Sequence, residues 1–140
     1  MNPFSTHLVL FNSLFNQYEV SSIFEFGMGL FSTPLFLEKS ESVISVEMHT
    51  IEWFNKVKES LVDSKFTCLC KLGPMATRWH CINSAFSKTK VIVTHDVEVP
   101  SYRWDLVNVP EDWVVFTDTK RVPHTRIYYH NSLNFNFKDL

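Results

Sequence analysis

The chain has 140 residues, a formal net charge of −2 and three glycines, and 15% of its residues are aromatic. This length fits one domain with a sizeable core, so we expect a single domain over residues 1–140. A net charge near zero provides no global basic field, which argues against nucleic acid and anionic membranes as partners. No apolar run approaches the roughly 20 residues of a membrane span, and the start of the chain lacks a signal-peptide pattern.

Three cysteines, Cys68, Cys70 and Cys81, cannot form a complete set of disulfides, and the sequence has no CxxC motif. Cys68 and Cys70 alternate along a predicted strand, which suits buried free thiols. Two further zinc ligands at suitable spacing are missing. We therefore expect a reducing, cytoplasmic compartment and no metal site.

Strand and helix signals alternate along most of the chain. Apolar residues at helical spacing predict the helices, and short β-branched or aromatic runs bounded by polar residues predict the strands. The expected elements are a helix over 3–18, a strand over 21–27, a helix over 31–39, a strand over 42–48, a helix within 49–64, a strand over 65–72, a helix around 75–87, a strand over 90–98, and two strands over 112–119 and 125–131.

Strands that alternate with helices predict an α/β fold with a mostly parallel sheet and helices on both faces. The last two strands are separated by the turn "KRVPH" and predict a C-terminal antiparallel hairpin. In such sheets ligands bind beyond the carboxyl ends of the strands. The polar residues expected at those ends include Glu25, Glu47, His95 and Asp96.

The first of these strands ends in "EFGMG", and the next one ends in "SVE". This pattern resembles the cofactor-binding half of class I S-adenosylmethionine-dependent methyltransferases, in which an acidic-x-Gly-x-Gly loop follows strand one and an acidic residue ends strand two. The following "FST" is similar to a branch of that family with Ser-Thr in place of a third glycine. The resemblance covers residues 20 to about 62 and implies a Rossmann-like three-layer sandwich.

The resemblance also implies S-adenosyl-L-methionine as cofactor and assigns roles in binding it. Glu25 would face the ammonium side of the amino-acid end, and Glu47 would accept hydrogen bonds from the ribose hydroxyls. Glycines allow close approach of the backbone, and the free N–H groups of the next helix can hold a carboxylate. The expected cofactor-binding residues are Glu25, Gly27, Gly29, Ser32, Thr33, Glu47, Met48 and His49.

Nicotinamide dehydrogenases share the helix and the ribose carboxylate. Their fingerprint has a third glycine and usually no acid two residues before the first one. Here Ser32 stands at the third position, and the charge of Glu25 would be a poor neighbour for a pyrophosphate. The pattern therefore favours the methyl donor, while a simple turn around the two glycines is the structural alternative.

Methyl transfer requires alignment of donor and acceptor and, where the nucleophile is protonated, a base. In "THD", His95 is the candidate general base and Asp96 the group that orients it. The alternative is a polar strand end that caps the following turn. The acceptor expected is a small molecule or an exposed oxygen or nitrogen of a larger partner.

The chain departs from the family pattern after the third strand. It has no Asn-Pro-Pro-aromatic motif, and residues 66–90 are too few for the full arrangement, so the sheet is one strand and one helix short. Such a reduced chain is compatible with a homo-oligomer in which a second copy completes the site. Two alternative functions are an enzyme that cleaves S-adenosylmethionine and a non-catalytic subunit that binds it.

Overall fold

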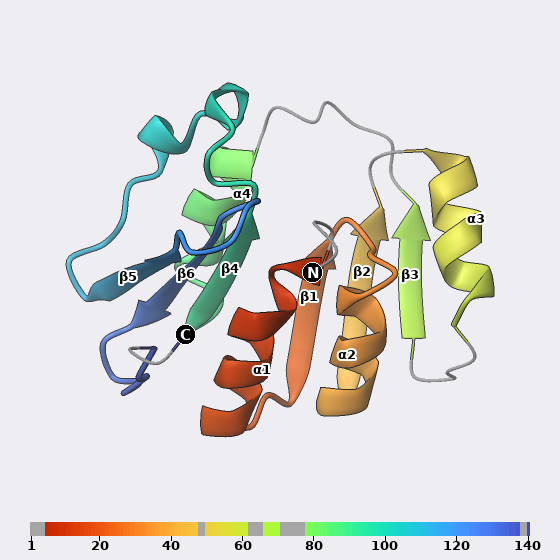
Figure 1. The fold of residues 1–140 in the computed structure, drawn as a ribbon, viewed down its shortest axis with the longest axis horizontal. Helices are drawn as coiled ribbons and strands as arrows, with labels where there is room; N and C mark the ends of the chain where they lie inside the picture. Colours follow the sequence, from red (N-terminus) through yellow and green to blue (C-terminus); the bar gives the residue numbers. More distant parts are fainter. Residues whose placement is uncertain (1–4, 48–49, 62–65, 71–77, 138–139) are drawn as a thin grey trace. The chain divides into compact units, whose positions relative to one another are not determined.

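The computed structural model describes residues 5–47, 50–61, 66–70, 78–137 and 140. The alternation of helices and strands predicted for the first part of the chain is confirmed (Figure 1). In chain order the elements are α1 (Leu8–Gln17), β1 (Ser22–Phe26), α2 (Ser32–Lys39), β2 (Ser42–Glu47), α3 (Ile51–Glu59), β3 (Phe66–Cys70), α4 (Arg78–Ala85), β4 (Val91–His95), the 3-10 turns η3 (Pro100–Tyr102) and η4 (Trp104–Leu106), β5 (Trp113–Asp118) and β6 (Thr125–His130).

The strands form two sheets, so the expected Rossmann-like three-layer sandwich with one mostly parallel sheet is wrong. One sheet is parallel, with the order β1-β2-β3, and the other is antiparallel, with the order β4-β6-β5. The reason lies after β4. The predicted hairpin returns β6 beside β5, and β6 also pairs with β4, so both of its ladders run antiparallel.

The chain divides into two compact units. Phe15–Met75 contains the parallel sheet with α2 and α3, and we call it the parallel-sheet unit. Met1–Leu14 together with Ala76–Leu140 contains the antiparallel sheet with most of α1 and all of α4, and we call it the antiparallel-sheet unit. The expectation of a single domain over residues 1–140 stays a prediction.

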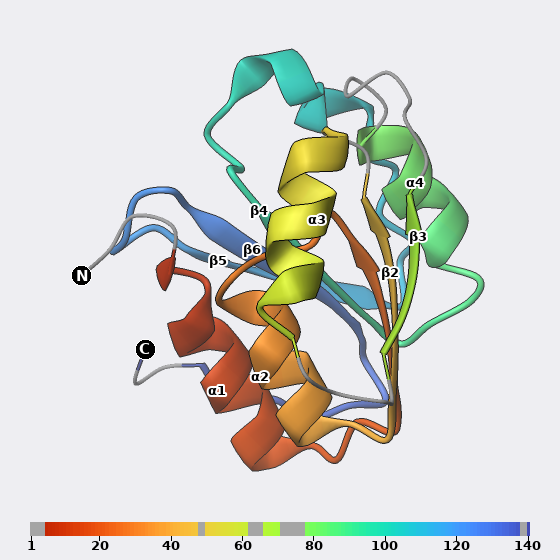
Figure 2. The same cartoon turned by 90° about the vertical axis from the view of Figure 1, so that its right-hand side faces the viewer.

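In the parallel-sheet unit, α2 and α3 lie on the same side of the sheet (Figure 2). Along β2 the side chains alternate, and Val43, Ser45 and Glu47 are all buried. The apolar residues Phe24 and Phe26 of β1 are each 56% exposed, although the sequence predicts a buried strand there. The buried face therefore holds carboxylates and hydroxyls, and these side chains form the candidate site.

In the antiparallel-sheet unit, β6 is the central strand and is buried on both faces. Ile127 packs with Leu10 and Leu14 of α1, whereas its neighbour Tyr128 packs with Ile82 of α4 and with Trp113. Successive residues of a strand point to opposite faces, so α1 and α4 contact opposite sides of this sheet.

Candidate functional site

The loop between β1 and α2 needs both of its glycines, for different reasons. Gly27 has a φ of +83°, a left-handed conformation that L side chains rarely adopt, and an added Cβ there would meet no atom of the described residues within 4 Å, its two chain neighbours aside. A Cβ on Gly29 would lie only 2.6 Å from Oγ of Ser32. Gly27 therefore supplies the turn beside open space, and Gly29 makes room for the first residue of α2.

Glu25 is the last residue but one of β1, lies on its buried face and accepts three hydrogen bonds from hydroxyl groups. Ser32 donates to Oε1 at 2.8 Å, Thr33 donates to Oε2 at 2.8 Å, and Ser45 of β2 donates to Oε2 at 2.6 Å. Thr33 in turn accepts from the backbone N–H of Gly29 at 2.9 Å. One carboxylate thus connects β1, β2, the glycine loop and the first turn of α2.

Burial raises the pKa of the Glu25 carboxyl above its usual value of 4.5, and the nearby Glu47 carboxylate adds to the rise. The three hydroxyl hydrogen bonds oppose this rise, because they stabilise the charged form. Two carboxylates at the ends of neighbouring strands therefore interact electrostatically.

Glu47 ends β2 and holds the same loop from the other strand. Its Oε2 accepts a hydrogen bond from the backbone N–H of Met28 at 3.0 Å, and only 2% of the residue is exposed. The carbonyl oxygen of Met28 accepts from Nε1 of Trp53, on α3, at 2.9 Å. Both polar backbone groups of this loop residue are thereby tied to neighbouring elements.

The structure brings together six of the eight residues predicted to bind the cofactor: Glu25, Gly27, Gly29, Ser32, Thr33 and Glu47. Met48 and His49 lie outside the described residues. The sequence prediction missed Ser45 and Trp53. Side chains alternate along β2, so Ser45 lies on the same face as Glu47, and this spacing was a signal that could have identified Ser45. No local pattern connects Trp53 to the loop.

The predicted catalytic pair lies in the antiparallel-sheet unit, at the end of β4. His95 Nδ1 is 3.2 Å from Oδ1 of Asp96, and its Nε2 is 3.1 Å from the hydroxyl of Thr6. That hydroxyl also donates to the carbonyl oxygen of Pro123 at 3.2 Å. The hydrogen bond from His95 lowers the pKa of Asp96, and Arg78 acts in the same direction.

Asp96 has a φ of +60°, which is unusual for a residue with a side chain. Arg78 donates to the carbonyl oxygen of His95 at 3.1 Å and to Oδ2 of Asp96 at 3.3 Å. The guanidinium carbon of Arg78 also lies 3.8 Å from the centre of the Tyr102 ring. The backbone strain at Asp96 is therefore accompanied by a dense set of polar contacts.

His7 was not singled out by the sequence, and its ring centroid lies 4.8 Å from that of His95. Both ring nitrogens are buried without a hydrogen-bond partner among the described residues. Burial lowers the pKa of His7 to about 4, with a smaller contribution from His95 and an opposing one from Asp96. His7 is therefore neutral at pH 7 and keeps one donor and one acceptor unused.

The glycine loop and the His95–Asp96 pair belong to different units, and each is described by itself. Within the described ranges, no three His, Cys, Asp or Glu side chains are grouped so that they could hold a metal ion. In the same ranges no helix has both the length and the apolar character needed to cross a bilayer.

Comparison with protein-family models finds none that matches this chain, and comparison with curated proteins also finds no match.

Proposed function

We propose that the Gly27–Gly29 loop binds S-adenosylmethionine and that the chain is a methyltransferase that uses it. The observation that carries the proposal is the contact of Glu47 with the backbone of Met28. Through it, the acid that ends β2 and the glycine turn that leaves β1 meet at one edge of a parallel sheet, where ligands of such sheets bind.

The residues of this edge fit a nucleoside that carries an amino-acid end. Apart from its chain neighbours, no atom in the described part of the chain lies within 4 Å of an added Cβ at Gly27, which supports the proposal that a ligand approaches the backbone there. The Glu47 carboxylate is of the type that accepts hydrogen bonds from two ribose hydroxyls. Glu25 already accepts from three hydroxyls, so we propose that it acts mainly by holding the loop and by its negative charge.

When bound, S-adenosylmethionine supplies an activated methyl group, so the chain has to align the acceptor and remove its proton. We assign proton removal to Nε2 of His95, while Asp96 holds Nδ1. Thr6 has to release Nε2 for this step, because its hydroxyl lies against that atom. The acceptor is a small molecule or an exposed oxygen or nitrogen of a larger partner, and the proposed compartment is the cytoplasm.

A second candidate is a subunit that binds S-adenosylmethionine without transferring its methyl group. Both ring nitrogens of His95 are engaged by Thr6 and Asp96. This arrangement supports a structural role for the pair as well as a catalytic one. The two candidates share the binding site and differ in turnover.

Binding is tested by calorimetry of the chain with S-adenosylmethionine, S-adenosylhomocysteine and NAD. We expect binding of the first two and none of NAD. Glu47→Gln can still accept from Met28 but loses its charge, and we expect its affinity to fall about tenfold or more, since hydrogen bonds to charged groups are the stronger ones. Glu41→Gln, an exposed site with the same chemical change, should leave affinity unchanged.

Turnover distinguishes the two candidates. Labelled-methyl transfer to a metabolite extract, lost in His95→Ala while binding persists, would support the methyltransferase. Binding without any transfer would support the non-catalytic subunit. Absence of binding by the wild-type chain, or equal affinity in Glu47→Gln, would contradict the proposed site.

A further inference from the structure

Strand β5 lies at an edge of the antiparallel sheet. Among the described strands it pairs only with β6. Its six residues, WVVFTD, include no proline and no lysine, which are devices that natural sheets use to block pairing at an edge. Val114 is 39% exposed and Val115 is 43% exposed.

The backbone groups that face outward can be identified from the ladder. Asn131 N–H donates to the carbonyl oxygen of Asp112 at 2.8 Å, so every second residue counted from Asp112 bonds towards β6. The residues between them, Val115 and Thr117, direct their N–H and C=O groups away from β6. No backbone hydrogen bond of these two residues to another described segment is present at that edge. Two donors and two acceptors are therefore available.

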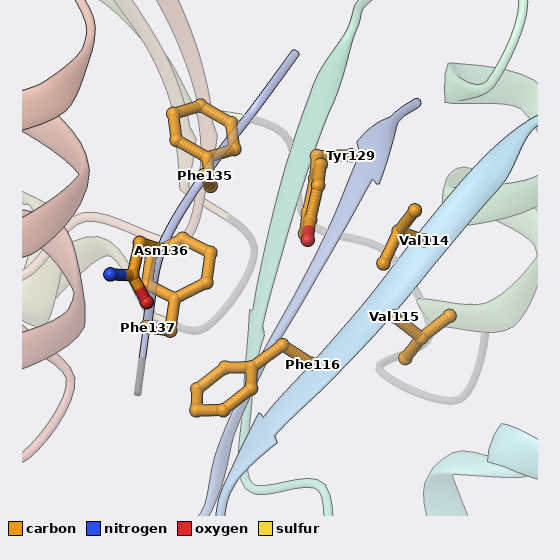
Figure 3. A pocket seen from close by; sticks show the side chains of 7 residues that line it. All are labelled: Val114, Val115, Phe116, Tyr129, Phe135, Asn136 and Phe137. Carbon is orange, nitrogen blue, oxygen red and sulfur yellow. The ribbon is translucent and has the colours of Figure 1, made fainter. Parts of the chain in front are cut away.

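An apolar hollow of about 260 Å³ lies along the same strand (Figure 3). Its lining combines β5, β6 and the C-terminal segment: Val114, Val115, Phe116, Tyr129, Phe135, Asn136 and Phe137. The rings of Phe116 and Phe137 are stacked with centroids 5.1 Å apart. Apolar side chains thus accompany the open hydrogen-bonding edge.

We propose that β5 is a homodimer interface, in which β5 of a second copy pairs antiparallel with it about a two-fold axis at Phe116. In this register, Val115 of each copy lies opposite Thr117 of the other copy. All four open backbone groups of each chain are then paired. The two Phe116 side chains meet at the axis beside the apolar hollow. A two-fold pairing is closed and leaves no free edge to propagate.

Charge favours this register over the neighbouring one, in which the axis passes through Val115. With the axis at Phe116, Asp112 lies opposite Lys120 of the second copy, just beyond each end of the strand. Within each copy the Asp112 carboxylate also lies 3.1 Å from Nε2 of His130, and the Lys120 ammonium also donates to the carbonyl oxygen of Leu140. With the axis moved to Val115, Asp112 would lie opposite Asp118 of the second copy, and like charges opposite one another destabilise a pair. That alternative would also set Thr117 opposite Trp113, whose N–H already donates to Pro110 at 3.1 Å.

Sedimentation equilibrium of the full chain from about 1 to 200 µM tests the dimer, since this range brackets the affinity of a weak specific contact. We expect a reversible monomer–dimer equilibrium. A monomer at every concentration, or open-ended assemblies in place of a dimer, would overturn the proposal.

A charge exchange tests the register. Asp112→Lys places lysine opposite Lys120, and Lys120→Glu places glutamate opposite Asp112, so each variant alone should dimerise at least about fivefold more weakly. A mixture of the two should form a heterodimer with the wild-type affinity, because every pair across the axis is again of opposite sign. Two variants that dimerise as wild type, or a mixture that does not recover the affinity, would contradict the pairing.

A backbone variant tests the hydrogen bonds. Val115→Pro removes an outward N–H from each chain without removing a donor from the β6 ladder, and we expect dimerisation about tenfold weaker. Val115→Thr keeps the N–H and a β-branched side chain and should dimerise as wild type. Circular dichroism establishes that each variant is folded. Equal loss in both would show that the side chain, and not the edge, carries the contact.

Discussion

The hydroxyl of Ser45 donates a hydrogen bond of 2.6 Å to the Glu25 carboxylate, and the two residues face each other across the β1–β2 ladder. The candidate site is therefore built on a side-chain pair that joins the strands as well as on their backbone hydrogen bonds. Both partners are buried, with 7% of Glu25 and none of Ser45 exposed.

Ser45→Ala should destabilise the chain by about 1–3 kcal/mol, because it removes a buried hydrogen bond to a carboxyl group and leaves that group with fewer donors. Urea unfolding measures this free energy. Ser22→Ala, at an exposed position of β1, is the matched control and should change stability by less than about 0.5 kcal/mol. Similar losses in the two variants would show that the Ser45 contact does not stabilise the sheet.

Glu25 should make stability fall as the pH rises. Its folded pKa lies above the usual value of 4.5, so the folded state binds the proton more tightly than the unfolded state does. This stabilisation is fully present below the usual pKa of 4.5 and is lost as the pH rises through the raised pKa of the folded state. Glu25→Gln should flatten this dependence in urea unfolding across the acid to neutral range, whereas Glu41→Gln should not. Parallel pH curves for wild type and Glu25→Gln would contradict the raised pKa.

The two glycines should respond differently to alanine. Gly27→Ala should cost about 1–2 kcal/mol, because the left-handed φ is strained for any L side chain while the space around it is open. Gly29→Ala brings its Cβ against the Ser32 hydroxyl, so in the double variant with Ser32→Ala the cost of the glycine change should shrink. Thermal unfolding of the wild type, the three single variants and the double variant gives both values. Additive effects at Gly29 and Ser32 would show that the predicted clash is absent.

His7 should make the antiparallel-sheet unit sensitive to acid. Its folded pKa of about 4 lies below the usual 6.5, so stability is lost as the pH falls through this interval, when the unfolded chain takes up the proton first. His95 and Asp96 face the same ring and are present in both proteins. His7→Phe should remove the contribution of His7 to the loss of stability at acid pH, whereas His80→Phe, at an exposed position, should not. An NMR titration that places the pKa of His7 near 6.5 would contradict the burial.

Local spacing was enough to predict the loop. "EFGMG" places Glu25 at the end of a strand and Gly27 at a left-handed turn, and both follow from residue order within five positions. The closeness of Glu47 followed from the rule that adjacent parallel strands end at one edge. The contact between Trp53 and Met28 depends on how α3 packs, and no short pattern contains that information.

The division into two sheets could not be predicted in the same way. The run VIVTH of β4 suits a parallel or an antiparallel neighbour equally well, because its β-branched residues fit either ladder. The partner of β4 is β6, which pairs with β4 along one edge and with β5 along the other. The side chains of Ile127 and Tyr128 in β6 pack against α1 and α4, on opposite faces of the sheet. Pairing between distant segments is a tertiary property, so alternation alone gave the wrong fold.

The most direct measurement is a titration of the 15N-labelled chain with S-adenosylmethionine, followed by NMR at the backbone amides. The account predicts saturable shifts at Gly27, Met28 and Gly29, which are lost or strongly weakened in Glu47→Gln. Spectra that do not change with the ligand, or shifts that leave these three amides untouched, would contradict it.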